Sequence, residues 1–153
     1  MFLLIMLDKN KKMCSDYQSD YSVKTAKRKK EGAMLKILIV DDEEHVRVPL
    51  SRYLESKGMA VLQASNLKEA IEVLDAAQSE IQVIVTDNDM ENQGDGLLLL
   101  KEVQQRGLLI PVMLASGRII ESDREKLRQE GFMEVFCKPA KREDILQAIK
   151  ACR

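Results

Sequence analysis

Short apolar segments recur along the chain from about residue 34, and each is five or six residues long. They are rich in valine, isoleucine and leucine, and they lie at residues 35–40, 59–64, 81–86, 110–115 and 133–137. Near-continuous apolar runs of this length are typical of strands buried on both faces, as in a parallel sheet. The pattern therefore predicts five parallel strands.

Between the predicted strands, apolar residues recur at intervals of three or four, the spacing of one buried helix face. Three such stripes stand out: Leu67, Ala70, Ile71 and Leu74; Leu97, Leu100 and Val103; and Ile145, Leu146, Ile149 and Cys152. Gly58, Gly107 and Gly131 each come just before a predicted strand, where glycine commonly ends a helix. This alternation predicts an α/β fold, a doubly wound, five-stranded parallel sheet with five helices over residues 34–153.

Pro49 lies inside the first predicted helix, at residues 43–57. Proline has no amide hydrogen to donate and its ring crowds the preceding turn, so we expect a bend between His45 and Val48 without loss of the helix. Ser65 and Asn66 precede the next helical stripe and are expected to cap that helix.

Charge divides the chain at Met34. The 153 residues include 24 lysines and arginines against 25 acidic residues. Residues 1–33 hold eight basic and four acidic residues, so they carry +4 and residues 34–153 carry −5. Apart from an apolar run at residues 1–7, the first 33 residues are polar, which predicts a disordered basic extension before one domain. The alternative is that translation starts at Met34.

Composition narrows the choice of partners. Aromatic residues make up 4% of the chain and the net charge is −1, so we expect no binding to nucleic acid. The run at residues 1–7 is too short to span a bilayer and lacks the flanks of a secretory signal, so we expect no membrane association. Cys14, Cys137 and Cys152 form neither a disulfide framework nor a zinc motif, which favours a reducing compartment and a cytoplasmic protein.

Polar residues gather where the predicted strands end, the edge at which open α/β sheets form their sites. They are Asp41 and Asp42 after the first strand, Asp87, Asn88 and Asp89 after the third, Ser116 and Gly117 after the fourth, and Lys138 and Pro139 after the fifth. Clustered carboxylates repel one another, and an oxygen-only site of this kind suits Mg²⁺. A cation, a lysine and a hydroxyl around Asp87 would stabilise a transferring phosphoryl group, and a carboxylate can form an acyl phosphate. Taken singly, each of these residues is a common turn, cap or loop residue.

The chain resembles the response-regulator receiver domain of two-component signalling, from Met34 to the C-terminus. The matching segments read ILIVDDEE, VIVTDNDM, PVMLAS and CKPA. The resemblance implies a flavodoxin-like sheet with strand order 2-1-3-4-5. It also implies that the phosphoryl donor is a phosphohistidine of a histidine kinase or phosphotransfer protein.

The resemblance implies a role for each residue of the predicted site. Asp87 would be the phosphoacceptor, Asp42 the direct Mg²⁺ ligand, Asp41 a ligand through water, the backbone carbonyl of Asp89 the last protein ligand, Ser116 the switch hydroxyl and Lys138 the family's lysine. The complete set is far more specific than any one of these residues alone.

Three positions depart from the family pattern. The proline expected four residues after Asp87 is Glu91, and the loop is one residue longer. The aromatic residue expected three positions before the lysine is Val135, with Phe136 beside it on the other face of the strand. Ala140 follows the Lys-Pro pair where phenylalanine is common. These changes affect how phosphorylation is transmitted more than whether it occurs.

Asp89 and Arg118 each follow a predicted site residue by two positions and carry opposite charges. We expect them to pair across the mouth of the pocket and to slow the access of a phosphoryl donor or of attacking water. A surface pair contributes up to about 1 kcal/mol, so the effect is expected to be modest.

These features predict a stand-alone, chemotaxis-regulator-like receiver, not an enzyme, that takes a phosphoryl group on Asp87 in a Mg²⁺-dependent phosphorelay. It would signal by altered binding to a downstream protein that the sequence does not identify, and a weak homodimer is one option left open. The alternative is a receiver-fold interaction module that no longer switches, which the altered loop and Val135 favour. A phosphatase using Asp87 and Asp89, as in the haloacid dehalogenase motif, is disfavoured because that motif follows a first strand and the chain lacks room for that fold.

Overall fold

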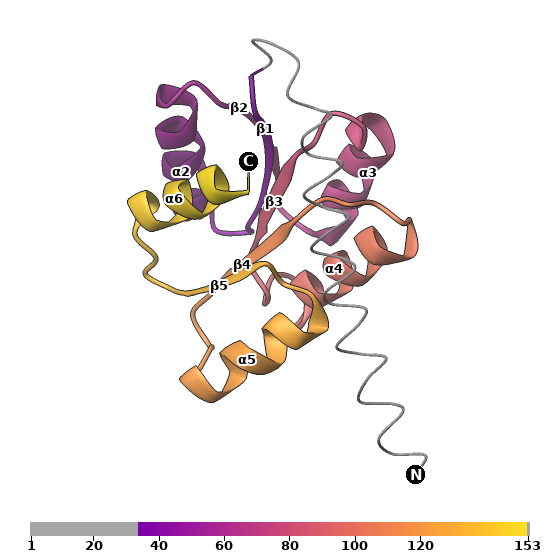
Figure 1. Cartoon of the computed structure of the whole chain (residues 1–153), viewed down its shortest axis with the longest axis vertical. Helices are drawn as coiled ribbons and strands as arrows, with labels where there is room; N and C mark the ends of the chain where they lie inside the picture. The colour runs from indigo at the N-terminus through magenta and orange to yellow at the C-terminus, as the bar shows by residue number, and fades with distance from the viewer. Residues whose placement is uncertain (1–33, 153) are drawn as a thin grey trace. The chain divides into compact units, whose positions relative to one another are not determined.

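The computed structural model describes residues 34–152, which form one α/β unit (Figure 1). Five parallel strands form one sheet in the order β2-β1-β3-β4-β5. The strands are β1 (Lys36–Val40), β2 (Ala60–Ala64), β3 (Val83–Thr86), β4 (Val112–Ser116) and β5 (Glu134–Cys137). The helices are α2 (Glu44–Ser56), α3 (Leu67–Ala77), α4 (Asp95–Gln105), α5 (Glu121–Glu130) and α6 (Arg142–Ala151). The predicted fold class and strand order are confirmed, whereas the predicted basic extension at residues 1–33 lies outside the described residues.

Each face of the sheet packs against its own helices. Along β1 the side chains alternate, so that Leu38 and Val40 belong to one hydrophobic cluster and Ile37 and Ile39 to the other. The first cluster includes buried residues of α3 and α4, and the second includes buried residues of α2 and α6. Figure 1 shows α2 and α6 on one side of the sheet and α3 and α4 on the other. Burial on both faces explains the near-continuous apolar sequence of the central strands.

The start of α3 is capped as the sequence predicts. The side-chain oxygen of Asn66 accepts a hydrogen bond from the amide of Glu69 at 2.8 Å. The carboxylate of Glu69 in turn accepts from the amide of Ser65 at 2.7 Å. The first contact satisfies a backbone donor that the first turn of a helix leaves without a partner, and the second ties the residue before the cap to the same turn.

Pro49 lies within α2 without ending it, as predicted. The helix continues for a further seven residues to Ser56. Leu50 and Leu54 are buried against the sheet, and this packing offsets the loss of one backbone hydrogen bond at the proline. The bend expected between His45 and Val48 stays a prediction.

The buried face of α4 differs from the prediction in one position. Leu100 and Val103 are buried as predicted, and Leu97 is partly buried against the same cluster. Leu99, which the predicted stripe did not include, is fully buried. Residues 97–100 of this helix are four consecutive leucines, so spacing alone does not show which of them faces the sheet. Leu98 is 51% exposed.

Gly96 brings the first turn of α4 against the end of β3. Its amide donates to the carbonyl oxygen of Asn88 at 3.1 Å. A Cβ atom at position 96 would lie 2.9 Å from the Cα atom of Asn88 and closer still to the carbonyl oxygen of Asp87. Both neighbours are backbone atoms, so they cannot move aside as a flexible side chain would.

We predict that Gly96→Ala lowers the free energy of unfolding by about 1–3 kcal/mol, because the added methyl group overpacks this contact. Urea-induced unfolding measures the change. Gly117→Ala is the matched control, since no atom lies within 4 Å of a Cβ built at that position, and it should stay within about 0.5 kcal/mol of the parent chain. Equal stabilities for the two variants would contradict the close contact.

Candidate phosphoryl-acceptor site

The carboxyl ends of four strands meet at one edge of the sheet and carry the residues predicted from the sequence. The amide of Asp87 donates to the carbonyl oxygen of Val40 at 2.9 Å, which joins the ends of β3 and β1. The amide of Lys138 donates to the carbonyl oxygen of Ser116 at 3.0 Å, which joins the ends of β5 and β4. The parallel register therefore brings Asp41, Asp87, Ser116 and Lys138 to the same edge.

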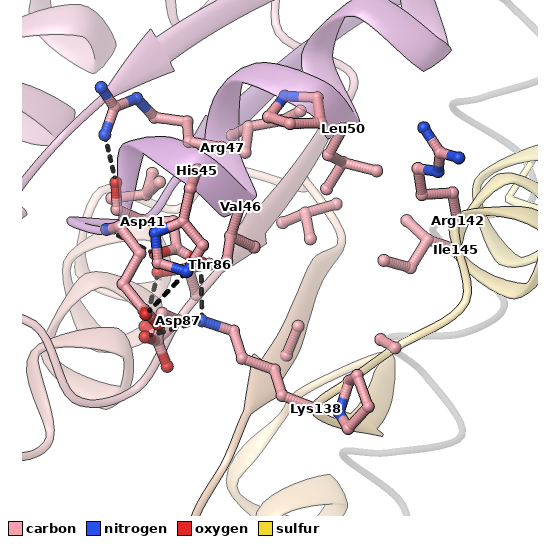
Figure 2. Close-up of a pocket in the computed structure, with 18 residues that line it drawn as sticks. Asp41, His45, Val46, Arg47, Leu50, Thr86, Asp87, Lys138, Arg142 and Ile145 are labelled. Carbon is pink, nitrogen blue, oxygen red and sulfur yellow. Dashed lines mark hydrogen bonds and ion pairs between the residues drawn. The ribbon is translucent and has the colours of Figure 1, made fainter.

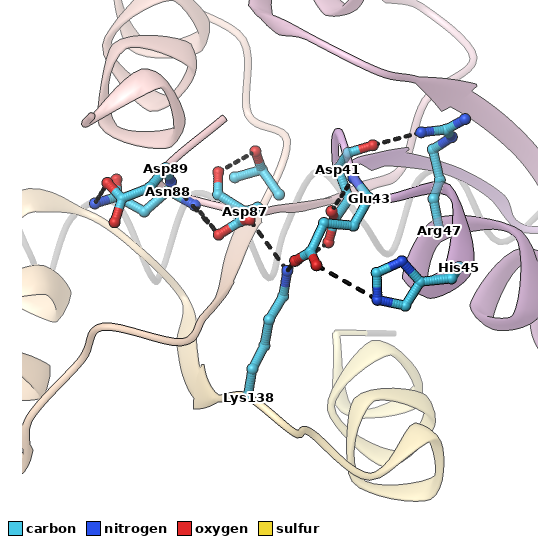
Figure 3. A network of polar contacts seen from close by, with 9 residues as sticks. Asp41, Glu43, His45, Arg47, Asp87, Asn88, Asp89 and Lys138 are labelled. Carbon is cyan, nitrogen blue, oxygen red and sulfur yellow. Dashed lines mark hydrogen bonds and ion pairs between the residues drawn. The ribbon is translucent and has the colours of Figure 1, made fainter. Parts of the chain in front are cut away.

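The ammonium group of Lys138 lies among three carboxylates, as Figure 3 shows. Its Nζ atom is 2.7 Å from Oδ2 of Asp41, 3.0 Å from Oδ2 of Asp87 and 3.3 Å from Oε1 of Glu43. Burial by itself would lower the pKa of Lys138, but Asp41 and Asp87 outweigh it and hold that pKa above its usual value. Lys138 is therefore a fixed positive charge at neutral pH.

The two carboxylate oxygens of Asp87 have different partners. Oδ2 faces Lys138, whereas Oδ1 accepts hydrogen bonds from the amides of Asn88 at 2.6 Å and Asp89 at 3.4 Å. Burial raises the pKa of Asp87 above its usual value, Asp41 adds to this, and Lys138 opposes it. The pKa of Asp87 is therefore raised by burial in spite of Lys138, whereas the pKa of Lys138 is raised by the two carboxylates in spite of burial.

A cluster of acidic side chains surrounds this pair. Asp41, Asp42, Glu43 and Asp87 each offer an oxygen atom, and these atoms all lie within 4.8 Å of one another. Asp42 and Glu43 are exposed, so a hydrated cation can reach them. An all-oxygen donor set fits Mg²⁺, whereas sites for zinc or copper favour nitrogen and sulfur ligands.

Glu43 is a member of this cluster that the sequence reasoning missed. Its only signal was its place directly after Asp41 and Asp42 in the DDEE run. Glu43 also contacts His45, the only histidine, whose Nε2 atom lies 3.4 Å from Oε2 of the carboxylate. It therefore links the start of α2 to Lys138.

Arg47 holds the backbone of the acidic turn, which carries Asp41, Asp42 and Glu43. No sequence pattern indicated this role. Its Nη1 atom donates to the backbone carbonyl oxygen of Asp41 at 2.6 Å, and its Nε atom donates to Gln63 of β2 at 3.3 Å. The amide of Glu43 donates to Oδ1 of Asp41 at 2.9 Å. These contacts leave Oδ2 of Asp41 facing Lys138.

Ser116 is buried at the end of β4, with 1% of its surface exposed. Among the described residues, its hydroxyl makes no hydrogen bond to Asp87 or Lys138. The hydroxyl is thus next to the site without being engaged in it. The role of switch hydroxyl stays a prediction.

Comparison with known proteins identifies the family. The family model of the response regulator receiver domain matches residues 37–150. The chain belongs to this family. The matched segment contains every residue of the site described above.

The relatives include regulators of known name. The KDP operon transcriptional regulatory protein KdpE of Escherichia coli (strain K12) is 32% identical over 106 residues, which are 69% of this chain and 45% of that protein. The alkaline phosphatase synthesis transcriptional regulatory protein PhoP of Bacillus subtilis (strain 168) is 28% identical over 116 residues, which are 76% of this chain and 47% of that protein. The chain thus spans about half the length of these relatives.

Solved structures agree with this family. A response regulator receiver domain protein from Clostridium thermocellum is 27% identical, with a TM-score of 0.71 over 78% of this chain and 94% of that one. The chemotaxis response regulator CheY4 of Vibrio cholerae has a TM-score of 0.70 over 79% of this chain and 100% of that one; at 23% identity it supports the fold alone.

Membership places this receiver domain in two-component signalling. Receiver domains interact with histidine kinases or phosphotransfer proteins, typically bind Mg²⁺ through acidic residues, and are generally signalling modules rather than enzymes. The acidic cluster of this chain has the composition that such a metal site needs. Within residues 34–152, no helix has the length and apolar character needed to cross a membrane.

The predicted pair between Asp89 and Arg118 is wrong. Oδ1 of Asp89 instead accepts hydrogen bonds from the amide of Gly94 at 3.2 Å and from Nδ2 of Asn88 at 3.3 Å. Arg118 is exposed and, within the part of the chain that the structure describes, forms no ion pair with Asp89. The longer loop brings the Gly94 amide within reach of Asp89, so this side chain turns into its own loop.

The other departures from the family pattern lie on the two faces of the sheet. Val135 is 1% exposed and belongs to the cluster beneath α3 and α4, whereas Phe136 packs against the cluster on the opposite face, as predicted. Ala140 lines a cavity of about 530 Å³ that extends to Asp87 and Lys138 (Figure 2). A small residue at position 140 leaves this space open between α2 and the segment that follows β5.

We predict that Asp87→Asn stabilises the protein at neutral pH in the absence of divalent cations. The raised pKa means that the folded protein binds the proton of Asp87 more tightly than the unfolded chain does. Stability from this group is therefore full below its ordinary value of 3.8 and is lost as pH rises through the raised pKa. Asparagine mimics the protonated form and retains that stability. We expect a gain of about 0.5–2 kcal/mol, the size that single stabilising substitutions commonly give.

Urea-induced unfolding from pH 3 to pH 8 measures this gain, which should be absent at the acidic end and should shrink at neutral pH when Mg²⁺ is added. Glu55→Gln, an exposed change on α2, controls for net charge. A gain of the same size at every pH would show that the ionisation of Asp87 is not its cause.

Proposed function

We propose that this receiver domain accepts a phosphoryl group on Asp87 from a phosphohistidine of a histidine kinase or phosphotransfer protein. The reaction is Mg²⁺-dependent, and the product signals by altered binding to a downstream protein. The observation that carries the proposal is the position of Asp87, a buried carboxylate 3.0 Å from the ammonium of Lys138 and within a cluster of further acids.

In the proposed step, a carboxylate oxygen of Asp87 attacks the phosphorus atom while the nitrogen–phosphorus bond of the phosphohistidine breaks. The product is an acyl phosphate on Asp87. The bonding electrons stay on the imidazole nitrogen, and the ring leaves as neutral imidazole when its other nitrogen carries a proton. Phosphoryl transfer of this kind depends mainly on positioning and charge neutralisation.

The residues of this chain supply both requirements. The amides of Asn88 and Asp89 hold one oxygen of Asp87 and so orient the carboxylate. Lys138, already charged, contacts the other oxygen and neutralises charge that gathers on the phosphoryl group.

The acidic cluster is proposed to hold the cation. The ligands would be Asp41, Asp42 and Asp87, with Glu43 and the backbone carbonyl of Asp89 beside them. Bound Mg²⁺ would supply positive charge to the phosphoryl oxygens. Its charge would also relieve the repulsion among the carboxylates.

The proposal extends to a receiver in the cytoplasm, with no nucleic acid or membrane as partner. It is supported by a net charge of −1, few aromatic residues and three widely spaced cysteines. The downstream partner is proposed to be a protein, and a weak homodimer is compatible with this proposal.

A second candidate is a receiver-fold interaction module that binds its partner without switching. Val135 favours it, because a buried valine has no ring that could move between the surface and the site when Asp87 is modified. The intact set of Asp87, Ser116 and Lys138 favours the switching protein, since a charged pocket without a use lowers stability.

We predict that acetyl phosphate adds one phosphoryl group to the chain in the presence of Mg²⁺, and at least tenfold less in its absence. Intact-protein mass spectrometry measures the gain. Asp87→Asn, which keeps the shape of the side chain but not the nucleophile, should show no gain. Phosphorylation of the Asp87→Asn variant to the parental level would place the acceptor elsewhere.

We predict that Ser116→Ala separates modification from switching. The variant should still be phosphorylated, but phosphorylation should no longer shift the amide NMR signals of residues 117–120, because the hydroxyl that draws this segment toward the site is missing. Ser116→Thr keeps a hydroxyl and should restore the shifts. If the parent chain itself shows no shifts beyond the loop at Asp87, the non-switching module is the correct function.

A further inference from the structure

The loop that joins β3 to α4 closes on itself through the side chain of Asp89. Oδ1 of Asp89 accepts a hydrogen bond from the amide of Gly94 at 3.2 Å, five residues further along the chain. Nδ2 of Asn88 donates to the same oxygen at 3.3 Å. Gly94 caps α4 with φ of +85°, a conformation that glycine adopts without strain. The hydrogen bond from the Gly94 amide to Asp89, which we call the clasp, therefore joins the first part of the loop to its last residue.

Other hydrogen bonds in this loop hold residues on either side of Asp89. The amide of Asn92 donates to Oδ2 of the buried Asp95 at 2.9 Å, and the amide of Gly96 donates to the carbonyl oxygen of Asn88 at 3.1 Å. The second contact ties Asn88, the residue before Asp89, to the first turn of α4. Among the hydrogen bonds of the described residues, only the one from the Gly94 amide to the Asp89 carboxylate connects Asp89 itself to the N-terminal end of α4.

The clasp affects the site because the backbone of Asp89 contacts Asp87 and is a proposed Mg²⁺ ligand. Its amide donates to Oδ1 of Asp87 at 3.4 Å, a long hydrogen bond that a small shift of the loop would break. Its carbonyl group is the proposed last protein ligand of Mg²⁺. Both groups belong to peptide units next to the side chain that is tied to Gly94.

We propose that Asp89 is a positioning residue, whose side chain holds its own backbone beside Asp87 through the Gly94 amide and thereby sets the affinity of the site for Mg²⁺. The side chain acts as a hydrogen-bond acceptor within the loop, rather than by its charge or by contact with a phosphoryl donor. The ordering of the loop by this side chain is independent of the proposed function. An effect of Asp89 on phosphorylation rests on the proposed function.

Two substitutions separate the acceptor from the charge. Asp89→Ala removes both, whereas Asp89→Asn removes the charge and keeps an oxygen that can accept from Gly94. An effect of charge on the cation would change both variants equally. A clasp is lost in Asp89→Ala and retained in Asp89→Asn.

Amide hydrogen exchange of Gly94, followed by NMR in the full chain without phosphoryl donor, reports the clasp directly. Exchange should be about fivefold faster or more in Asp89→Ala, the factor that corresponds to one modest hydrogen bond, and within about twofold of the parent in Asp89→Asn. A titration of the same samples with Mg²⁺ should show affinity about three- to tenfold weaker in Asp89→Ala and close to the parent in Asp89→Asn.

The proposal is overturned if Gly94 exchanges equally in the parent and Asp89→Ala, or if Asp89→Asn binds Mg²⁺ as weakly as Asp89→Ala. The rate of phosphorylation by acetyl phosphate at saturating Mg²⁺ is measured separately. If the parent and all variants remain unphosphorylated while hydrogen exchange and Mg²⁺ affinity change as expected, the positioning role is supported and only the proposed function fails.

Discussion

The ammonium group of Lys138 joins parts of the chain that are far apart in sequence, and the site depends on it. Its carboxylate partners Asp41, Glu43 and Asp87 are 97, 95 and 51 residues away. One positive charge does not neutralise three acids, and burying unbalanced charge costs free energy. The apolar core on both faces of the sheet must offset that cost. The raised pKa of Asp87 shows the same imbalance, because burial and Asp41 outweigh Lys138 there. A site with excess negative charge gains from a cation, and that is the chemistry proposed for it.

The sheet and the loop between β3 and α4 differ in how they accommodate changes of sequence. The ends of β1, β3, β4 and β5 are tied by backbone hydrogen bonds, so the positions of Asp87 and Lys138 follow from strand register rather than from their own side chains. The loop after β3 accommodates an extra residue with Asp89 bound to the amide of Gly94, although the side-chain oxygen Oδ1 of Asn88 is buried there without a hydrogen-bond partner among the described residues. Gly96 keeps α4 against the end of β3 in spite of that extra residue. A departure from the family pattern in the loop therefore need not disturb the acceptor.

Helix α5 has a different attachment from its neighbours. It has no buried residue, and polar contacts secure its C-terminal half: Arg128 lies 2.6 Å from Glu134 of β5, and Gln104 of α4 donates to the carbonyl oxygen of Glu130 at 3.0 Å. An element with few buried apolar contacts shifts at low cost in free energy. With Val135 in place of an aromatic residue, the attachment of α5 offers a physical basis for altered binding that does not require a moving ring.

The sequence by itself determined the strands and helices of this protein and predicted which polar residues gather at one edge of its sheet. Apolar periodicity depends on which face of a strand or helix is buried, so it located all five strands, and the polar residues at their ends predicted Asp41, Asp87, Ser116 and Lys138. The cap at Asn66 was also predictable, because its partners lie within one helical turn. Only the tertiary structure decided that Leu99 faces the core, that Glu43 and Arg47 support the acidic turn, and that Asp89 binds Gly94 instead of Arg118. Each of these depends on distances that packing and loop length set in three dimensions, and no periodic pattern along the chain encodes them.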